Sequence, residues 1–224
     1  MDLLPQSIVH YLPVTDRDEQ WGVVCTTAGY QNVPPHSPYP LTQHPDSYSF
    51  TRSRGRVLGE YQLLYIVSGQ GEFRSASSPA VRVKAGTAVM LFPDEWHTYA
   101  PDPETGWEEW WVGFRGPDVD RRVAAGFFSP KAPLLHIGHS AGIVSCYQEI
   151  IRTAEAERKG FQQLIAGIVL HLLGSVLFKR DNLQYLDNPI VEKIDRAREE
   201  MAAAIEKVKL IDKQDQEEQN NENK

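Results

Sequence analysis

In the middle of the chain the apolar residues fall into short runs that glycine, proline and polar residues separate. The run EYQLLYIVSGQGEFRS over 60–75 predicts an apolar strand, a hairpin turn at Gly69 and Gly71, and a short return strand. The run VRVKAGTAVMLFP over 81–93 places Gly86 between two further strands. Short strands that glycine and proline interrupt about every ten residues are typical of an antiparallel barrel or sandwich.

The next stretch, 97–116, begins and ends in aromatic-rich strands that a Pro/Asp/Gly loop connects. Upstream, 21–30 and 48–52 have the composition of two more strands, and the segment 32–47 between them is rich in proline. Proline removes the backbone donor that a sheet interior needs, so 32–47 is expected to be a fixed loop. The polar segment 1–20 predicts an arm rather than a strand of the barrel.

After residue 116 the apolar period changes to three and four residues, which predicts helices over 117–127 and 141–157. The segment 127–138 between them is an irregular return with room for one more strand. A second long helix over 161–180 is apolar almost all round. A helix outside a barrel buries only one stripe there, so the other stripe needs a partner. We expect a helix of a second subunit to be that partner in a homodimer, through Leu164, Ile168, Leu172, Leu173 and Val176.

A third helix is expected over 190–210, and the polar end 211–224 has the composition of a disordered segment. The chain is therefore expected to divide into an arm (1–20), a barrel (21–138), a helical dimerisation region (139–187) and a last helix with a polar tail (188–224).

Charge and cysteine content narrow the class of protein. The 23 basic and 30 acidic residues give a net charge of −7, so no basic field over the whole chain favours nucleic acid. Cys25 and Cys146 match no zinc, redox or disulfide spacing, which predicts free thiols in a reducing compartment. The N-terminus lacks the pattern of a signal peptide, and the apolar run 164–178 is shorter than the roughly 20 residues that span a bilayer. We expect a cytoplasmic protein.

Two pairs of residues on the aromatic strands are candidates for a binding site. His97 and Tyr99 are two positions apart, and so are Glu109 and Trp111, so each pair shares one face of its strand. If both pairs face the barrel interior, they form a pocket with an aromatic wall and three hydrogen-bonding groups. Such a pocket suits a sugar, whose C–H face covers an aromatic ring while polar groups bind its hydroxyls. The alternative, in which Trp111 and His97 are core residues and Glu109 is solvated, stays open at this point.

A catalytic metal is not expected. A metal-binding barrel needs clustered histidine and carboxylate ligands, but no histidine lies between His44 and His97, and His36 and His44 belong to the proline-rich loop. No serine, cysteine or lysine has the setting of a nucleophile, and GQG at 69–71 is a turn rather than a phosphate loop. We therefore predict no cofactor, no catalytic residue and no enzymatic activity.

At these residues the chain resembles the AraC-type transcription regulators, specifically their N-terminal effector-binding domain. The resemblance is carried by GRVLGEYQLLYIVSGQGEF (55–73), by VKAGTAVMLFPDEWHTYAPDPETGWEEWWVGFRG (83–116) and more loosely by AGYQNVPPHSPYP (28–40). It covers roughly 20–180. It implies an α+β fold, in which a cupin-like jelly-roll barrel that has lost its metal precedes C-terminal helices that dimerise as an antiparallel coiled coil.

The resemblance also implies a sugar or sugar acid as effector. In the arabinose-sensing members the sugar lies against residues that match His97, Tyr99 and Trp111, whereas Glu109 stands where that relative has a histidine. An arginine also contacts the sugar there, and Arg54 or Arg56 is its match. The N-terminal arm closes over the ligand in such proteins, which is the role implied for 1–20.

A complete family member continues into two helix-turn-helix units, whereas here only VEKIDRAREEMAAAIEKV (191–208) resembles the first helix of that domain. The resemblance makes 188–224 a remnant, and we expect this chain by itself not to bind operator DNA specifically. The alternative function is that of a small metal-dependent cupin enzyme acting on a carbohydrate. It would require His97, with His36 or His44 and a carboxylate such as Glu60 or Glu109, to converge on a divalent metal.

Overall fold

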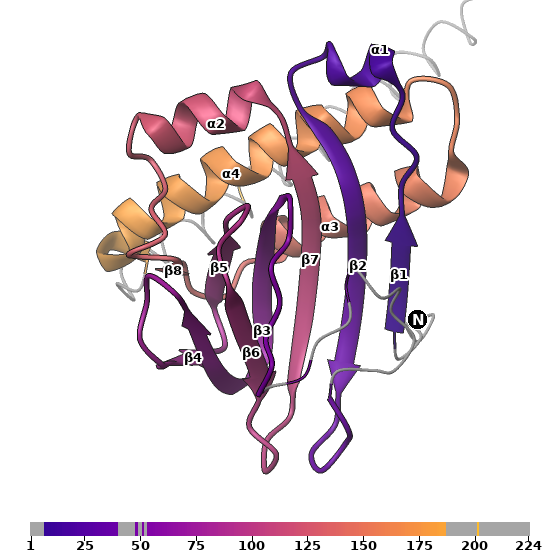
Figure 1. Cartoon of the computed structure of the whole chain (residues 1–224). Helices are drawn as coiled ribbons and strands as arrows, with labels where there is room; N and C mark the ends of the chain where they lie inside the picture. Colours follow the sequence, from indigo (N-terminus) through magenta and orange to yellow (C-terminus); the bar gives the residue numbers. More distant parts are fainter. Residues whose placement is uncertain (1–6, 40–47, 49–50, 52, 187–200, 202–224) are drawn as a thin grey trace, which may run out of the picture. The chain divides into compact units, whose positions relative to one another are not determined.

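The computed structural model describes residues 7–39, 48, 51, 53–186 and 201. The chain divides into two compact units, of which 1–181 holds nearly all of the described structure, and 182–224 is the other. The strands and the helices down to residue 181 are described within the first unit (Figure 1). The predicted helix 190–210 and the predicted polar tail lie outside the described residues, apart from Met201.

The first unit is built on one antiparallel sheet with the strand order β1-β2-β7-β3-β5-β8. The strands β4 and β6 lie off this path and pair with the second half of β3, which leaves the main sheet and forms a second sheet with them. The barrel that the sequence predicts is confirmed. Its strands are β1 (Ser7–Tyr11), β2 (Val24–Val33), β3 (Tyr61–Ser75), β4 (Val81–Lys84), β5 (Thr87–Leu91), β6 (His97–Pro101), β7 (Trp107–Arg115) and β8 (Leu134–His136).

The hairpin turn predicted at Gly69 and Gly71 is wrong, because β3 runs without interruption from Tyr61 to Ser75. The glycines instead let one strand change sheets. Gly69 has φ +77°, and a Cβ there would lie 2.1 Å from the backbone oxygen of Gly106. Gly71 leaves room for the ring of Trp107. Sequence reasoning mistook a bend that needs close backbone contact for a chain reversal.

The arm predicted at 1–20 is also corrected where it is described. Residues Ser7–Tyr11 form β1, which pairs with β2 in register from Ser7 opposite Gln31 to Tyr11 opposite Thr27. A short helix, α1 (Asp16–Glu19), follows and is capped by Thr15. The N-terminal segment is therefore the edge strand of the main sheet.

The other local predictions fared better. Gly86, with φ +79°, turns β4 into β5, and the loop after Pro101 joins β6 to β7. The predicted helices appear as α2 (Pro117–Ala124), α3 (Ala141–Ala156) and α4 (Phe161–Leu186), and the extra strand within 127–138 is β8. Of the predicted strand 48–52, only residues 48 and 51 are described, and neither lies in a strand.

The two faces of the main sheet pack differently. One face, with Tyr65, Trp110, Val112 and Phe114, forms the larger core together with residues of α3 and α4. The opposite face and the second sheet enclose a smaller core, which includes Tyr99. Figure 1 shows the helices on one side of the sheet, with β4 and β6 in front of it. The alternation of side chains along β7 thus sends every second residue toward the helices and the others into the barrel.

The face of α4 assigned to dimerisation is corrected by its burial. Ile168, Leu172, Leu173 and Val176 belong to the chain's own core, and only Leu164 is exposed, at 53%. The prediction chose the wrong stripe because an almost wholly apolar helix gives no contrast to set its phase. By length and composition alone α4 could cross a membrane, but its apolar residues from Ile165 to Val176 pack in this core.

Gln162, on the first turn of α4, ties this helix to the sheet. Its side chain is buried, accepts a hydrogen bond from the Cys25 N–H (3.0 Å), and donates to the carbonyls of Cys25 (2.9 Å) and Pro13 (3.0 Å). Cys25 lies where the register of β2 against β7 slips, between Cys25 and Thr27. A bulge disrupts the ladder, and Gln162 gives this residue hydrogen-bond partners there.

Candidate ligand-binding cavity

A cavity lies inside the barrel, between the main sheet and β6. The empty space totals about 400 Å³, which includes a part that is open to solvent. Side chains fill most of the interior, and the space left between them is little more than a water molecule needs. Most of its lining is polar or aromatic. The lining residues are Val9, Tyr11, Thr27, Gln31, Tyr39, Tyr48, Arg56, Gln62, Tyr99, Glu109 and Trp111.

Arg56 is the only cation among these lining residues. The backbones of Arg56 and His97 exchange two hydrogen bonds (2.9 and 3.0 Å), which fix the arginine beside β6. Its guanidinium donates to His97 Nε2 (3.2 Å) and to the Tyr48 carbonyl (2.9 Å). It also donates to Gln62 Oε1 (3.3 Å) and to the Tyr99 hydroxyl (2.7 Å). A planar group with five N–H bonds can serve these diverging acceptors at once, which a lysine could not.

His97 supports this arginine from behind and does not line the cavity itself. It is 1% exposed, and its Nδ1 lies 3.0 Å from the Glu95 carbonyl. Because Nε2 accepts from Arg56, Nδ1 carries the proton and the ring is neutral. Burial, together with the adjacent guanidinium of Arg56, lowers the pKa of His97 to about 4.

Glu109 and Gln31 face each other across β7 and β2, as register partners, and each is 3% exposed. The Tyr39 hydroxyl donates to Glu109 Oε1 (3.3 Å), whereas Glu109 Oε2 and Gln31 Nε2 have no hydrogen-bond partner in the described part of the chain. Burial raises the pKa of Glu109 to about 8, although Tyr39, Arg56 and the nearby Trp107 act in the opposite direction. This shift favours the protonated form of Glu109 near neutral pH.

Trp111 supplies the aromatic wall, and a glycine sets its position. A Cβ at Gly29, the register partner of Trp111, would lie 2.2 Å from Cζ2 of the indole and 2.6 Å from the Ile8 carbonyl. The indole therefore lies directly on the β2 backbone. The rings of Tyr39 and Tyr99, whose centroids are 6.3 Å apart, line the cavity together with it.

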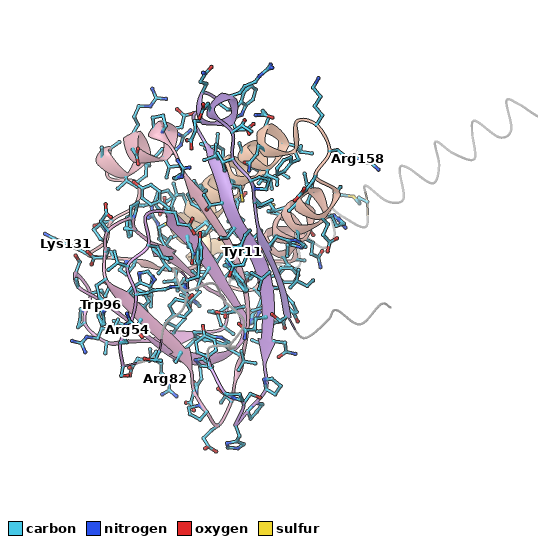
Figure 2. All side chains as sticks on the ribbon, turned by 45° about the vertical axis from the view of Figure 1, so that its right-hand side comes forward. Tyr11, Arg54, Arg82, Trp96, Lys131 and Arg158 are labelled. Carbon is cyan, nitrogen blue, oxygen red and sulfur yellow. The ribbon has the colours of Figure 1, made fainter. Side chains whose placement is uncertain are left out.

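The structure brings together five of the six ligand-binding residues that the sequence proposes. Tyr99, Glu109, Trp111 and Arg56 line the cavity, and His97 lies one hydrogen bond behind them. Arg54 does not belong to this group, because its side chain is exposed and its carbonyl accepts a hydrogen bond from the Trp96 indole (2.9 Å). Figure 2 shows Arg54 and Trp96 together, well apart from Tyr11 of the cavity.

Sequence reasoning missed most of the polar lining. Thr27 and Gln62 lie on predicted strands, and the period of two could have placed them on the inner face. Gln31 lies one residue beyond the predicted strand 21–30, whereas β2 continues to Val33. Tyr39 comes from the proline-rich segment 32–47, where no periodic signal exists. Tyr48 begins the predicted strand 48–52, but in the structure it does not lie in a strand. Tyr11 was missed because β1 was taken for an arm.

A second polar cluster adjoins the cavity at Glu60. Its carboxyl accepts hydrogen bonds from Gln62 Nε2 (2.9 Å), the Tyr48 hydroxyl (3.2 Å) and the Thr27 hydroxyl (3.4 Å). Within the described ranges, no three His, Cys, Asp or Glu side chains converge as metal ligands would. His36 is exposed and lies 3.9 Å from Glu104, and His44 lies outside these ranges.

Comparisons with known proteins agree with the geometry. The family model described as "AraC-like ligand binding domain" matches residues 35–173. Among solved structures, the YhaK protein from Escherichia coli is 12% identical over 49% of this chain and 44% of its own, with a TM-score of 0.35. An RmlC-like cupin from Methanocaldococcus jannaschii is 14% identical over 54% of this chain and 92% of its own (TM-score 0.33). A Cupin 2 conserved barrel domain protein from Salinispora arenicola is 17% identical over 55% and 88% (TM-score 0.31). No curated protein matches the chain.

Proposed function

The chain belongs to the family of AraC-like ligand-binding domains, and from this premise we propose that it is the sugar-sensing, dimerising part of a cytoplasmic transcription regulator. Membership of this family supports a small-molecule effector. The proposal that the effector is a sugar depends on one observation: an indole and many hydrogen-bonding side chains line the same cavity inside the barrel.

The chemistry of the lining fits a carbohydrate. The Trp111 face offers an apolar surface for the C–H side of a pyranose, while Gln31, Glu109 and Tyr99 are within the same cavity to bind hydroxyls. Arg56 holds Tyr99 and Gln62 in place rather than acting as a loose surface cation. Tyr99, Glu109 and Trp111 keep their predicted ligand-binding roles in this proposal. Arg56 and His97 become positioning residues, and Arg54 leaves the site.

Binding requires the cavity to open. Because little more than a water-sized site is free inside, a sugar has to displace side chains at the rim. Tyr11 of the edge strand β1 lines the cavity, as does Tyr48, and their rings lie 5.0 Å apart. We therefore assign to β1 the covering role that the sequence analysis gave to the arm.

The test is a thermal-shift screen of mono- and disaccharides, sugar acids and amino sugars, with and without chelator. A ligand that binds only the native state stabilises it by about 2.7 kcal/mol at a hundredfold excess over Kd. A shift of several degrees, lost in Trp111→Ala and kept in Arg54→Ala, is the expected result. A screen in which no compound shifts the melting temperature would contradict the proposal.

Dimerisation is proposed through the exposed face of α4. Leu164, Gly167, His171, Gly174 and Phe178 are exposed and follow one another at spacings of three and four residues. That spacing is the seam of a coiled coil, and nothing lies within 4 Å of a Cβ at either glycine, so a second helix could approach closely. Leu164 and Phe178, at the two ends of this stripe, are 53% and 64% exposed.

Sedimentation equilibrium at micromolar concentration tests this face. The wild type is expected to be a dimer, Leu164→Asp with Phe178→Asp a monomer, and the exposed Lys131→Asp a dimer like the wild type. A wild-type monomer would overturn the proposal.

The metal-dependent cupin enzyme remains the second candidate because His97 and Glu109 are buried in the same barrel. Against it, Nε2 of His97 accepts from Arg56, and Nδ1 faces the Glu95 carbonyl, so neither nitrogen faces a metal. The chelator arm of the screen separates the two functions. A melting temperature that chelator alone lowers, with about one metal ion per subunit, would favour the enzyme.

A further inference from the structure

Within the part of the chain that the structure describes, Gln31 Nε2 and Glu109 Oε2, on two residues that line the cavity, have no hydrogen-bond partner. Gln31 Nε2 and Glu109 Oε2 belong to side chains that are each 3% exposed, on residues that are paired across β2 and β7. Folded proteins leave very few buried polar atoms unpaired, since an unpaired one loses its hydrogen bonds to water and gains none. Two such atoms at one place in a cavity indicate a ligand that supplies the missing partners.

The chemistry of the pair indicates which groups the ligand presents. An amide nitrogen only donates, and a protonated carboxyl can both donate and accept. Two neighbouring hydroxyls match this set, because one can accept from Gln31 while the other exchanges hydrogen bonds with Glu109. Resting on the proposed function, we propose that Gln31 and Glu109 select an uncharged vicinal diol, with Glu109 acting as a neutral carboxylic acid. The effector is then a neutral sugar or polyol rather than a sugar acid or an amino sugar.

The charges around the cavity support this selection. The guanidinium of Arg56 already donates four hydrogen bonds, to His97, Tyr48, Gln62 and Tyr99. A ligand carboxylate would lose its hydrogen bonds to water on entering the cavity, and the Arg56 guanidinium could replace them only in part. Glu60 accepts three hydrogen bonds at the other end of the network.

An ammonium group fits no better. It would share the cavity with Arg56 and would need Glu109 to give up its proton. Among the described lining residues, the other titratable groups that face Glu109 are the hydroxyls of Tyr39 and of Tyr99 on β6, and the lining also includes Tyr11 of β1 and Tyr48. Burial raises the pKa of each of these tyrosines, so they stay neutral to high pH. His97 is neutral as well, because burial lowers its pKa to about 4.

Glu109 is the group that titrates in the working range, since burial raises its pKa to about 8. If the neutral acid is the binding form, a neutral ligand should bind about tenfold more weakly at pH 9 than at pH 7. Glutamine at 109 keeps the shape and the donor of a carboxylic acid but cannot ionise. Glu109→Gln should therefore bind within a few-fold of the wild type at pH 7 and lose the pH dependence.

The experiment uses probes that share a skeleton and differ in charge: glucose, glucuronate and glucosamine, and likewise galactose, galacturonate and galactosamine. Calorimetric affinities are measured at pH 7 and pH 9 for the wild type, Glu109→Gln, Gln31→Leu and the control Glu108→Gln. Glu108 neighbours Glu109, but its side chain points to the other face of β7 and does not line the cavity. The neutral member of a set should bind at least tenfold more tightly than its charged partners, and Gln31→Leu should lose at least tenfold.

The outcomes separate this inference from the function on which it rests. A glucuronate or glucosamine type of ligand that binds more tightly than its neutral partner would overturn the inference and leave a sugar sensor. The same holds if affinity at pH 9 equals that at pH 7, or if Glu108→Gln weakens binding as Glu109→Gln does. Failure of every probe in the wild type would count against both the inference and the sugar-sensing function.

Discussion

A glycine, which has no side chain, positions the aromatic wall of the cavity. Gly29 lies under the Trp111 indole on one side and near the Ile8 carbonyl of β1 on the other. Any Cβ at this position would push the indole away from β2 and strain the pairing of the edge strand. Gly29 thus allows both the Trp111 indole and the edge strand β1 to lie close to β2.

We predict that Gly29→Ala destabilises the protein by about 2 kcal/mol, because a methyl group has to enter space that two other groups occupy. Gly59→Ala is the matched control, since nothing lies within 4 Å of a Cβ there, and a change of no more than about 0.5 kcal/mol is expected. Urea unfolding midpoints of both variants measure the difference. Equal midpoints would show that the indole is not held against β2.

At this scale, strand periodicity predicted which residues of β6 and β7 lie together. Tyr99, Glu109 and Trp111 were found because side chains on a strand alternate and their strands were recognisable. Arg56 could not be told from Arg54, because the loop before β3 has no period and only the bridge to His97 fixes its direction. Gln31 was missed because the predicted first strand ends at residue 30, whereas β2 continues to Val33 beside β7.

Among the elements, α4 shows how a helix can be recognised and its orientation still be mistaken. Its length and apolar character predict the helix, but side chains apolar all round do not reveal which stripe faces the sheet. The clue was polar: Gln162 at its start is buried because β2 needs its amide. A glutamine within such an apolar helix indicates here a buried face that packs on the sheet, and not a face exposed to solvent.

Gln162→Leu should lower the free energy of unfolding by about 3 kcal/mol, because the buried N–H and C=O of Cys25 would lose their partners. The neighbouring Gln163→Leu provides the control. Among the described residues, the Gln163 side chain donates to the half-buried Asp18 (2.7 Å) and to no buried backbone group, so a loss below about 1 kcal/mol is expected. Chemical denaturation of the two variants measures both values, and similar losses would contradict the role given to Gln162.

In the molecule as a whole, two buried groups around the cavity respond to acid in opposite directions. His97, with its lowered pKa, is neutral when folded, so stability is lost as pH falls from about 6.5 toward 4. Glu109, with its raised pKa, is protonated when folded, so its contribution is fully present below about 4.5 and is lost as pH rises toward 8. Between pH 7 and pH 5 the two trends oppose each other.

We therefore expect the ligand-free wild type to change little in stability between pH 7 and pH 5, as far as these two residues decide it. Glu109→Gln leaves the effect of His97 alone, so this variant should lose about 2 kcal/mol on acidification. His97→Gln leaves only the effect of Glu109, so the free energy of unfolding of this variant should rise by about 2 kcal/mol between pH 7 and pH 5. Urea unfolding at both pH values checks this, and three parallel pH profiles would contradict it.

The hydrogen bonds of Gln162 to Cys25 and Pro13 also provide a way to detect ligand binding. The amide proton of Cys25 is held by a helix side chain, so it exchanges with solvent deuterium only when α4 lifts from β2. The same side chain holds the carbonyl of Pro13, two residues beyond the cavity-lining Tyr11. One slowly exchanging amide, followed by mass spectrometry or NMR, therefore reports whether filling the barrel tightens the contact between its edge strand and the helix.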